Sequence, residues 1–170
     1  MTSFAIFKDL TPTLLDPNTL YGFMSRTQLE QATDYALAQL KIAEGEIHAL
    51  PKPLQIALVI NSAQGIIDNG GLEYFYESDF DGTPLYSLFV DAYRTIGAEA
   101  GAVCIDASHR MFPFEKPHLH ELKRQQWLDT VRNNEDSEFV KLSRKICGDE
   151  VVWKKLAEYV TKNHDAFHAV

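Results

Sequence analysis

The stretch LQIALVINSAQGIIDNGGLEYFYES, Leu54–Ser78, decides the fold of this 170-residue chain. Up to Ile67 its apolar residues cover most of a helical circumference, as they do in a helix that is buried on all sides. Pro51 and Pro53 precede it, and proline is tolerated in the first turn of a helix. A buried strand is the alternative, but the apolar run is longer than an ordinary strand. The stretch therefore predicts a central apolar helix around which the other elements pack.

Two glycines interrupt the stretch directly after the apolar run, in the sequence Asn69-Gly70-Gly71. A residue with positive φ commonly ends a helix, and Asn69 or Gly70 is expected to supply it. The other glycine lets a short helix over residues 72–78 start at a sharp angle. We interpret the triplet as a structural hinge that turns an aromatic face back onto the central helix. Three residues at helical spacing form that face: Leu72, Phe75 and Tyr76.

Apolar residues at helical spacing predict further helices along the rest of the chain. Gly97 should act as a second hinge by ending one of them. Residues 1–18 show no clear period and are expected to form an N-terminal arm. The sequence thus predicts an all-α protein with one domain over residues 19–170, a compact bundle of about seven helices around the central helix, with no convincing strand. The expected helices span residues 19–46, 51–68, 72–78, 84–96, 98–111, 118–133, 137–147 and 150–164.

Several protein classes do not match this composition. The sequence has no run of 18 apolar residues, so no membrane span is expected. Its first residues lack the basic flank and the apolar core of a signal peptide. Cys104 and Cys147 are far apart and form no paired motif, which is typical of reduced thiols. A cytoplasmic location is therefore expected.

Acidic residues are concentrated in one part of the chain. Residues 1–110 carry 14 acidic and 6 basic residues, whereas residues 111–170 carry 10 of each, so the net charge of −8 falls entirely in the first part. No Lys or Arg lies between Lys52 and Arg94. Direct nucleic-acid binding needs a basic patch, so we expect no direct nucleic-acid ligand and favour a basic partner protein, or none. The acids in that interval are Asp68, Glu73, Glu77, Asp79, Asp81 and Asp91.

These six acids are the candidate partner-binding residues. Glu73 and Glu77 share one face of the short helix, and Asp79 and Asp81 follow in the loop. Since the apolar residues must face the core, the six carboxylates are expected to form one exposed negative patch beside the hinge. The basic residues of the last 60 are expected on solvated helix faces with local ion pairs. They include Arg124, Arg132, Arg144, Lys145 and Lys155.

No constellation in the sequence has the pattern of a catalytic or metal site. Asp106, Ser108 and His109 are neighbours in sequence, whereas the members of a triad come from separate elements. Phosphate-binding loops, dinucleotide fingerprints and nucleophile elbows are absent. We therefore expect no catalytic residue, no metal and no cofactor. Two groups of histidines are weak candidates for metal ligands: His118 and His120, with Glu115 and Glu121 nearby, and His164 with His168.

Two motifs nevertheless resemble a known family. The segment NGGLEYFYES, followed by an acidic loop and a helix, and the segment YRTIGAEAGAVCIDASHRMFP are similar to the signature of the bacterial DNA-mimic-protein C-terminal-domain family. The similarity covers residues 20–129 and is most specific at Asn69–Gly71 and Ile96–Ala98. It implies an all-α fold and an acidic homodimer that occupies the DNA-binding surface of a transcription regulator. The shared motifs belong to the scaffold, so the resemblance assigns no binding role to individual residues.

Three functions follow from this sequence and stay open at this point. The first is a non-enzymatic acidic interaction protein, a double-stranded-DNA mimic that binds a basic DNA-binding protein. The second is a helical structural or immunity-type module whose acidity serves only solubility. The third is an enzyme with an unrecognised site, which a deep polar pocket with perturbed titratable groups would reveal. The arrangement of the acids in space distinguishes the first from the second.

Overall fold

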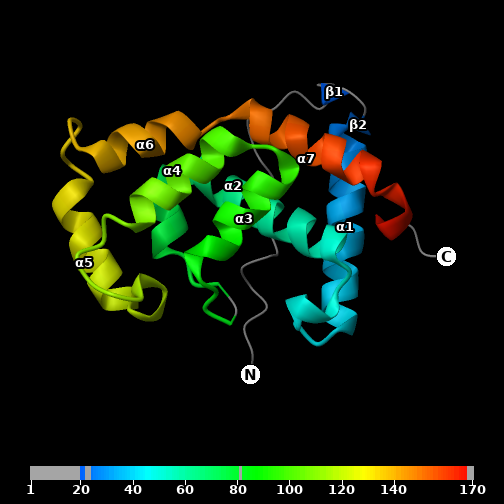
Figure 1. Ribbon diagram of the computed structural model, residues 1–170, viewed down its shortest axis with the longest axis horizontal. Helices are drawn as coiled ribbons and strands as arrows, with labels where there is room; N and C mark the ends of the chain where they lie inside the picture. The colour runs from blue at the N-terminus through cyan, green and yellow to red at the C-terminus, as the bar shows by residue number, and fades with distance from the viewer. Residues whose placement is uncertain (1–19, 22–23, 81, 168–170) are drawn as a thin grey trace.

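Helix α2, Lys52–Glu77, runs through the middle of the molecule (Figure 1). It contacts five other helices, α1, α3, α5, α6 and α7. Between Leu54 and Ile67 nearly every side chain is buried, including Ile60, Ala63 and Ile67. The predicted central apolar helix is therefore confirmed. The chain is seen here in a computed structural model that describes residues 20–21, 24–80 and 82–167.

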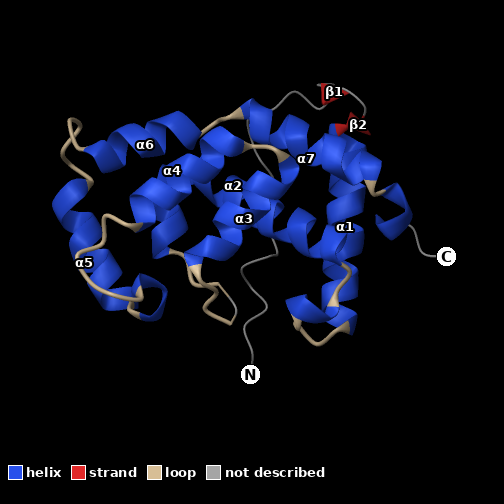
Figure 2. Cartoon of the chain, in the orientation of Figure 1, coloured by secondary structure: helices blue, strands red, loops and turns tan. Residues whose placement is uncertain are grey.

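The remaining described elements are almost all helices, which confirms the all-α fold (Figure 2). Short 3₁₀ turns at Ile47–Ala49, Pro117–Leu119 and His164–Phe167 lie between or after the helices. The predicted arm over residues 1–18 lies outside the described residues. The other α-helices are α1 (Arg26–Ile42), α3 (Tyr86–Ile96), α4 (Glu99–His109), α5 (Glu121–Val131), α6 (Glu138–Ile146) and α7 (Glu150–Lys162).

The first helix is shorter than the predicted span of residues 19–46. It begins with a capping box, in which Ser25 Oγ accepts from the Gln28 N–H and Gln28 Oε1 accepts from the Ser25 N–H. This reciprocal pairing satisfies two backbone donors at a helix start. The residues before it form a minimal antiparallel pair of strands, β1 (Leu20–Tyr21) and β2 (Met24–Ser25). The sequence patterns did not predict these strands.

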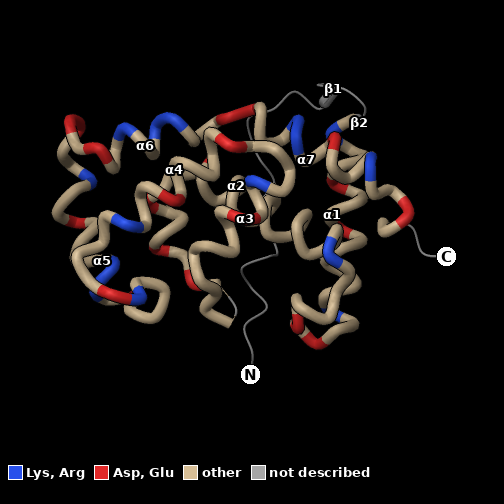
Figure 3. The backbone as a smooth tube through the Cα atoms, in the orientation of Figure 1, with Lys and Arg blue, Asp and Glu red and all other residues tan. Residues whose placement is uncertain are grey.

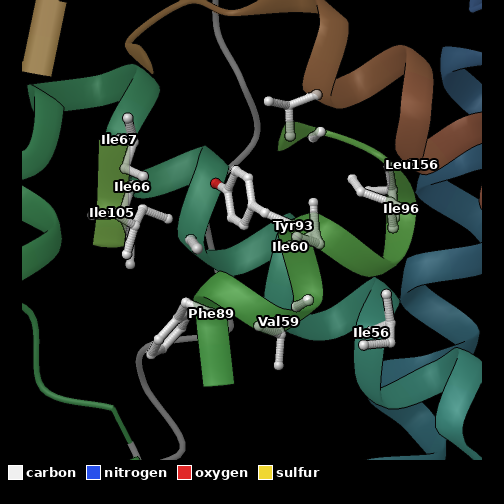
Figure 4. Close-up of a cluster of buried hydrophobic side chains, with 14 of the residues drawn as sticks. Ile56, Val59, Ile60, Ile66, Ile67, Phe89, Tyr93, Ile96, Ile105 and Leu156 are labelled. Carbon is white, nitrogen blue, oxygen red and sulfur yellow. The ribbon is translucent and has the colours of Figure 1, made fainter. Parts of the chain in front are cut away.

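The hydrophobic core lies between α2, α3, α4 and α7 (Figure 4). Ile60 of α2, Tyr93 of α3 and Leu156 of α7 are all fully enclosed there. A second, aromatic part of the core forms around Phe75 and Tyr76 of α2, whose rings meet edge-on. Phe89 also contacts the Phe75 ring edge-on, with centroids 5.0 Å apart. The aromatic residues after the two glycines therefore turn inward, as the hinge interpretation predicted.

The hinge joins two helical segments that together make up α2, as the sequence predicted. Helical backbone continues to Glu77, and only Gly70 (φ −161°, ψ 21°) and Gly71 (φ 69°, ψ −165°) depart from it. We predicted the positive φ at Asn69 or Gly70, and that assignment was wrong, because Gly71 alone of the three adopts it. At Gly70 the constraint is steric instead, since a Cβ atom there would collide with the ring of Tyr74. The sharp turn is nevertheless located where the sequence placed it.

The second predicted hinge also has the expected backbone. Gly97 (φ 81°, ψ 20°) follows the last residue of α3 in the left-handed conformation, and its N–H bonds to the carbonyl of Arg94. This turn lets α4 begin at Glu99 and pack back on α3. None of the helices in the described ranges is long and apolar enough to cross a membrane.

The helices place two ends of the molecule far apart (Figure 1). Helix α5 forms one end, where it contacts the part of α2 that follows the kink. Helix α1 and the last turn of the chain form the other end. Helices α6 and α7 run along one long side and connect the two. The kink of α2 is therefore covered by α6, and the acidic residues after it face α5.

Candidate functional surface

Asp68 is half-buried, and both of its carboxylate oxygens have partners within the structure. Its Oδ1 accepts from the Gly148 N–H at 2.8 Å and from Gln64 Nε2 at 2.6 Å. Its Oδ2 accepts from Trp153 Nε1 at 2.8 Å. A carboxylate with three donors connects α2 to the turn between α6 and α7, a structural role. Asp68 is therefore not the freely exposed carboxylate that the sequence predicted, because these three donors hold it in place.

Gln64 continues this buried network toward α3. It is 0% exposed, and its Oε1 accepts from the Tyr93 hydroxyl at 2.8 Å. Its Nε2 also donates to the carbonyl of Ile146 at the end of α6. Burial raises the pKa of Tyr93 well above its ordinary value, and the charge of Asp68 adds to the shift. The hydroxyl therefore remains a neutral donor, which is the state this network requires.

Side chains of α6 satisfy the backbone groups that the kink leaves unpaired. Ser143 Oγ accepts from the Leu72 N–H at 2.9 Å. The thiol of Cys147, directly after α6, donates to the carbonyl of Asp68 at 3.9 Å, and partial desolvation of the sulfur together with the charge of Asp68 raises its pKa. On the other side of the kink, Asn69 Nδ2 donates to the carbonyl of Gly65 at 2.7 Å. These contacts fix the direction in which the last turns of α2 leave the kink.

Glu73 and Glu77 lie together on those last turns, as their spacing predicted, but a base lies between them. Arg132 Nη1 is 2.7 Å from Glu73 Oε1, and its Nη2 is 2.8 Å from Glu77 Oε1. Asp129 Oδ1 also lies 2.8 Å from Nη2. We call Glu73, Glu77, Asp129 and Arg132 the Arg132 cluster. Burial opposes the charge of Arg132, but the carboxylates, Glu73 foremost, outweigh it and raise the pKa of the guanidinium.

Asp79 has a basic partner that is almost completely enclosed. Arg124 is only 3% exposed, and its Nη2 lies 3.2 Å from Asp79 Oδ1. The same guanidinium donates to the Tyr76 carbonyl through Nε and to the Pro117 and His118 carbonyls through Nη1. It thus ties the end of α2 to the loop before α5. We had expected Arg124 on a solvated helix face, and that expectation was wrong. The guanidinium is buried instead, where its N–H groups donate to these carbonyls.

The other two predicted patch residues do not extend the Arg132 cluster. Asp81 lies outside the described residues. Asp91 is exposed on α3, and no basic side chain of the described segments pairs with it. The prediction of one continuous, uncompensated patch is therefore wrong: of the five described acids, one is half-buried in a hydrogen-bond network, three are paired with arginines, and one stands apart. Figure 3 shows acidic and basic residues interspersed along the helices.

The arginine partners could not be read from the local sequence. Arg132 is separated by 55 residues from Glu77, and Arg124 by 45 from Asp79. A count of charges between Lys52 and Arg94 does not detect bases that return from a later helix. The mixture of acidic and basic residues at positions 121–132 did not indicate these ion pairs either, because alternating charge is typical of a solvated helix.

One exposed aromatic residue borders the Arg132 cluster. Tyr74 lies on the same turns of α2 as Glu73 and Glu77, and it is 52% exposed. Its ring occupies the space that a side chain at position 70 would need. Gly70 therefore allows Tyr74 to lie against the kink of the helix. Nothing in the sequence patterns singled out Tyr74.

The histidines and cysteines do not assemble into a chemical centre in the described part of the chain. His118 and His120 lie around the 3₁₀ turn before α5, and burial lowers the pKa of His118, with Lys116 and Arg124 contributing. Over the described ranges, no group of three or more His, Cys, Asp or Glu side chains is placed to hold a metal ion. His168 lies outside the described residues. Cys104 is buried and Cys147 is exposed, and both are free thiols.

Comparison with known proteins identifies a family. The family model described as DMP19-like protein matches residues 48–163, from the turn before α2 to the end of α7. This span includes the kinked helix, the Arg132 cluster and the network around Asp68, and it starts and ends later than the predicted resemblance over residues 20–129. No curated protein and no solved structure matches the chain. Because the match covers well over half of the sequence, the chain belongs to the DMP19-like protein family.

Proposed function

We propose that this protein is a non-enzymatic DNA mimic, which binds the nucleic-acid-binding face of a basic regulator through its own carboxylates. Membership of the DMP19-like family supports a protein of the DNA-mimic type. The acidic composition supports it further, because the net charge of −8 disfavours direct contact with DNA. A cytoplasmic location and a homodimer are part of this proposal.

The Arg132 cluster is the observation that carries the proposal. It holds three carboxylates around one guanidinium, so a local excess of negative charge remains. Arg132 contacts Oε1 of Glu73 and Oε1 of Glu77, and no described residue hydrogen-bonds the Oε2 atom of either. Asp129 is also largely exposed, at 68%. The cluster therefore offers oxygen acceptors to a basic partner, as phosphates do.

The fold orders these acceptors before binding. Glu73 and Glu77 follow a kink that Ser143 and Cys147 hold in place, and Arg132 restricts their rotamers. Ordering long side chains on association costs about 0.5–1.5 kcal/mol each. Carboxylates that are already ordered avoid part of this cost. This distinguishes the Arg132 cluster from acids that serve only solubility, which need no fixed position.

The test is competition with DNA. Proteins captured by the immobilised chain from nuclease-treated lysate of the native host are purified and bound to a fluorescent DNA duplex. The chain should displace the duplex, and its affinity should fall steeply with salt concentration. The triple variant Glu73→Gln, Glu77→Gln and Asp129→Asn should displace it far less well. Each amide keeps an oxygen for Arg132, so the fold should persist.

The matched control carries the same change of charge at the other end of the molecule. Asp34→Asn, Glu44→Gln and Glu46→Gln lie on and after α1, and no described residue forms an ion pair with them. This control should compete like the parent chain. If both triple variants displace the duplex equally poorly, only the net charge matters and the Arg132 cluster is not the binding surface. Duplex binding that the parent chain does not affect at any salt concentration would refute the DNA-mimic function.

A further inference from the structure

We propose that Tyr74 makes the docking surface selective for arginine over lysine on the partner. This inference rests on the proposed function and names the side chain that the surface accepts. The surface consists of the exposed face of the last turns of α2, formed by Tyr74, Glu73 and Glu77. The occupant is the guanidinium of an arginine on a basic protein.

The first argument is the position of the aromatic ring. Tyr74 presents an exposed ring in the middle of an ordered helix, next to a glycine whose missing side chain makes room for it. Its neighbours Phe75 and Tyr76 are completely buried, whereas Tyr74 lies against Gly70 and leaves about half of its surface exposed. Exposed tyrosines are enriched where proteins bind one another.

The second argument is the arrangement of charge around this ring. In helical geometry Glu77 lies between Glu73 and Tyr74 around the axis, because residues three and four apart are neighbours. Glu77 is thus the carboxylate residue whose position on the helix lies next to that of Tyr74. A planar guanidinium stacks on an aromatic face and donates in its own plane to a carboxylate at the same time. Lysine has a compact ammonium that makes one of these contacts well, but not both.

The structure contains an example of the same pairing chemistry on the inner side of these carboxylates. Arg132 donates through two nitrogens of one guanidinium to Glu73 and Glu77. Their separation therefore matches the width of a guanidinium. An arginine from outside would meet the same two carboxylates at their outer oxygens, with Tyr74 as an additional stacking surface. Charge complementarity and shape thus select the same partner group.

The experiment compares an oligoarginine and an oligolysine peptide of equal length and charge. Fluorescence anisotropy measures binding of each to the full chain at several salt concentrations. We expect the arginine peptide to bind roughly two- to fivefold more tightly, the range that one exposed cation–π contact gives. Tyr74→Leu should remove this preference, whereas Tyr74→Phe, which keeps the ring, should retain it. Leu85→Ala, another exposed apolar position, should behave like the parent.

Each outcome separates this inference from the proposed function. Equal binding of both peptides, lost in the Glu73→Gln, Glu77→Gln and Asp129→Asn variant, would overturn arginine selectivity and leave electrostatic docking intact. A preference for arginine that Tyr74→Leu does not change would also overturn the role of Tyr74. Failure of both peptides to bind at low salt would contradict the acidic docking surface and with it the proposed function. A far-UV circular dichroism spectrum of each variant confirms that it is folded.

Discussion

At the scale of single residues, the two adjacent glycines of the hinge have different tasks. Gly71 has a backbone conformation (φ 69°, ψ −165°) that is essentially restricted to glycine. Gly70 has an ordinary φ, but it leaves room for the Tyr74 ring. The pattern Asn-Gly-Gly predicts a turn, yet it does not say which residue adopts the positive φ. That depends on how the segment after the kink docks on α6.

Gly71→Ala should therefore be strongly destabilising. The Cβ atom would force a strained φ and would collide with Ser143 Oγ, which caps the Leu72 N–H. Together these effects should lower the free energy of unfolding by about 2–4 kcal/mol. Urea denaturation of the variant measures the change.

Gly82→Ala provides the control for backbone strain alone. Gly82 also has a positive φ of 75°, but a methyl group added there would have no neighbouring atom within 4 Å. Its substitution should cost only about 1 kcal/mol. If both variants lose the same stability, the contact with Ser143 does not contribute at Gly71.

Asp68 shows how the charge of a residue misleads when its position is unknown. Asp68→Asn leaves one fewer acceptor for Gly148, Gln64 and Trp153, so one buried donor loses its partner. The free energy of unfolding should fall by about 2 kcal/mol. The same substitution at the exposed Asp91 should change it by less than about 0.5 kcal/mol. A thermal melt in which the two variants coincide would contradict the internal role of Asp68.

At the scale of elements, the contacts between distant helices are stronger than the local patterns suggested. Helix α5 looked like a solvated helix because its charges alternate, yet Arg124 on its inner face is almost completely buried. Its guanidinium donates to the Tyr76 carbonyl near the end of α2 and to the Pro117 carbonyl in the loop that precedes α5. Arg124 therefore helps to position α5 against α2, together with the buried Leu128 and with Arg132 directly after the helix.

Replacing Arg124 by methionine should therefore cost about 3 kcal/mol in unfolding free energy. The carbonyls of Tyr76, Pro117 and His118 would lose their donor in a region that water does not reach freely. Arg110→Met is the matched control, because Arg110 is exposed and pairs only with Asp106 among the described residues. That change should stay within about 0.5 kcal/mol. Equal stability of the two variants in guanidinium chloride would show that the buried arginine is dispensable.

Sequence patterns located helices better than they located contacts. The apolar runs placed α2, α3 and α4 close to their observed positions, because burial imposes a 3.6-residue period on the chain. The start of α1 was placed too early, because the capping box at Ser25 and Gln28 was not recognised. The ion pairs of Glu73, Glu77 and Asp79 could not be predicted, because their partners lie on α5 or directly after it. Tertiary packing brings these charged residues together, and the spacing of residues within one segment gives no information about such packing.

At the scale of the whole molecule, α2 joins both ends into one cooperative unit. It contacts α1 and α7 near one end and α5 near the other. The two tryptophans report on two positions along α2, since Trp127 of α5 lies near one end and Trp153 of α7 bonds to Asp68 beside the kink. Trp127→Phe and Trp153→Phe each leave one reporter. We expect the remaining fluorescence in both variants to follow the same urea transition as circular dichroism, once each curve is expressed as a fraction unfolded.

Separate transitions for the two tryptophans would contradict this cooperative unit. Trp153→Phe also removes the Nε1–H donor to Asp68, so its midpoint should be lower than that of Trp127→Phe. Within each variant, the fluorescence and circular dichroism curves should therefore coincide. The midpoints of the two variants need not be equal. A split transition would divide the chain into two folding units at the kink of α2.

The network at the kink joins residues 64–72 to residues 143–153, and this separation has a consequence for synthesis. A ribosome adds about 5–20 residues per second, so the kinked segment waits several seconds before its partners are made. During that interval the apolar side of α2 and the carboxylates of Glu73 and Glu77 are exposed on a nascent chain that lacks Arg124 and Arg132. Folding is completed only after translation has nearly ended. A stalled product that ends near residue 110 therefore carries the full net charge of −8 without the helices that fix Glu73 and Glu77 in place.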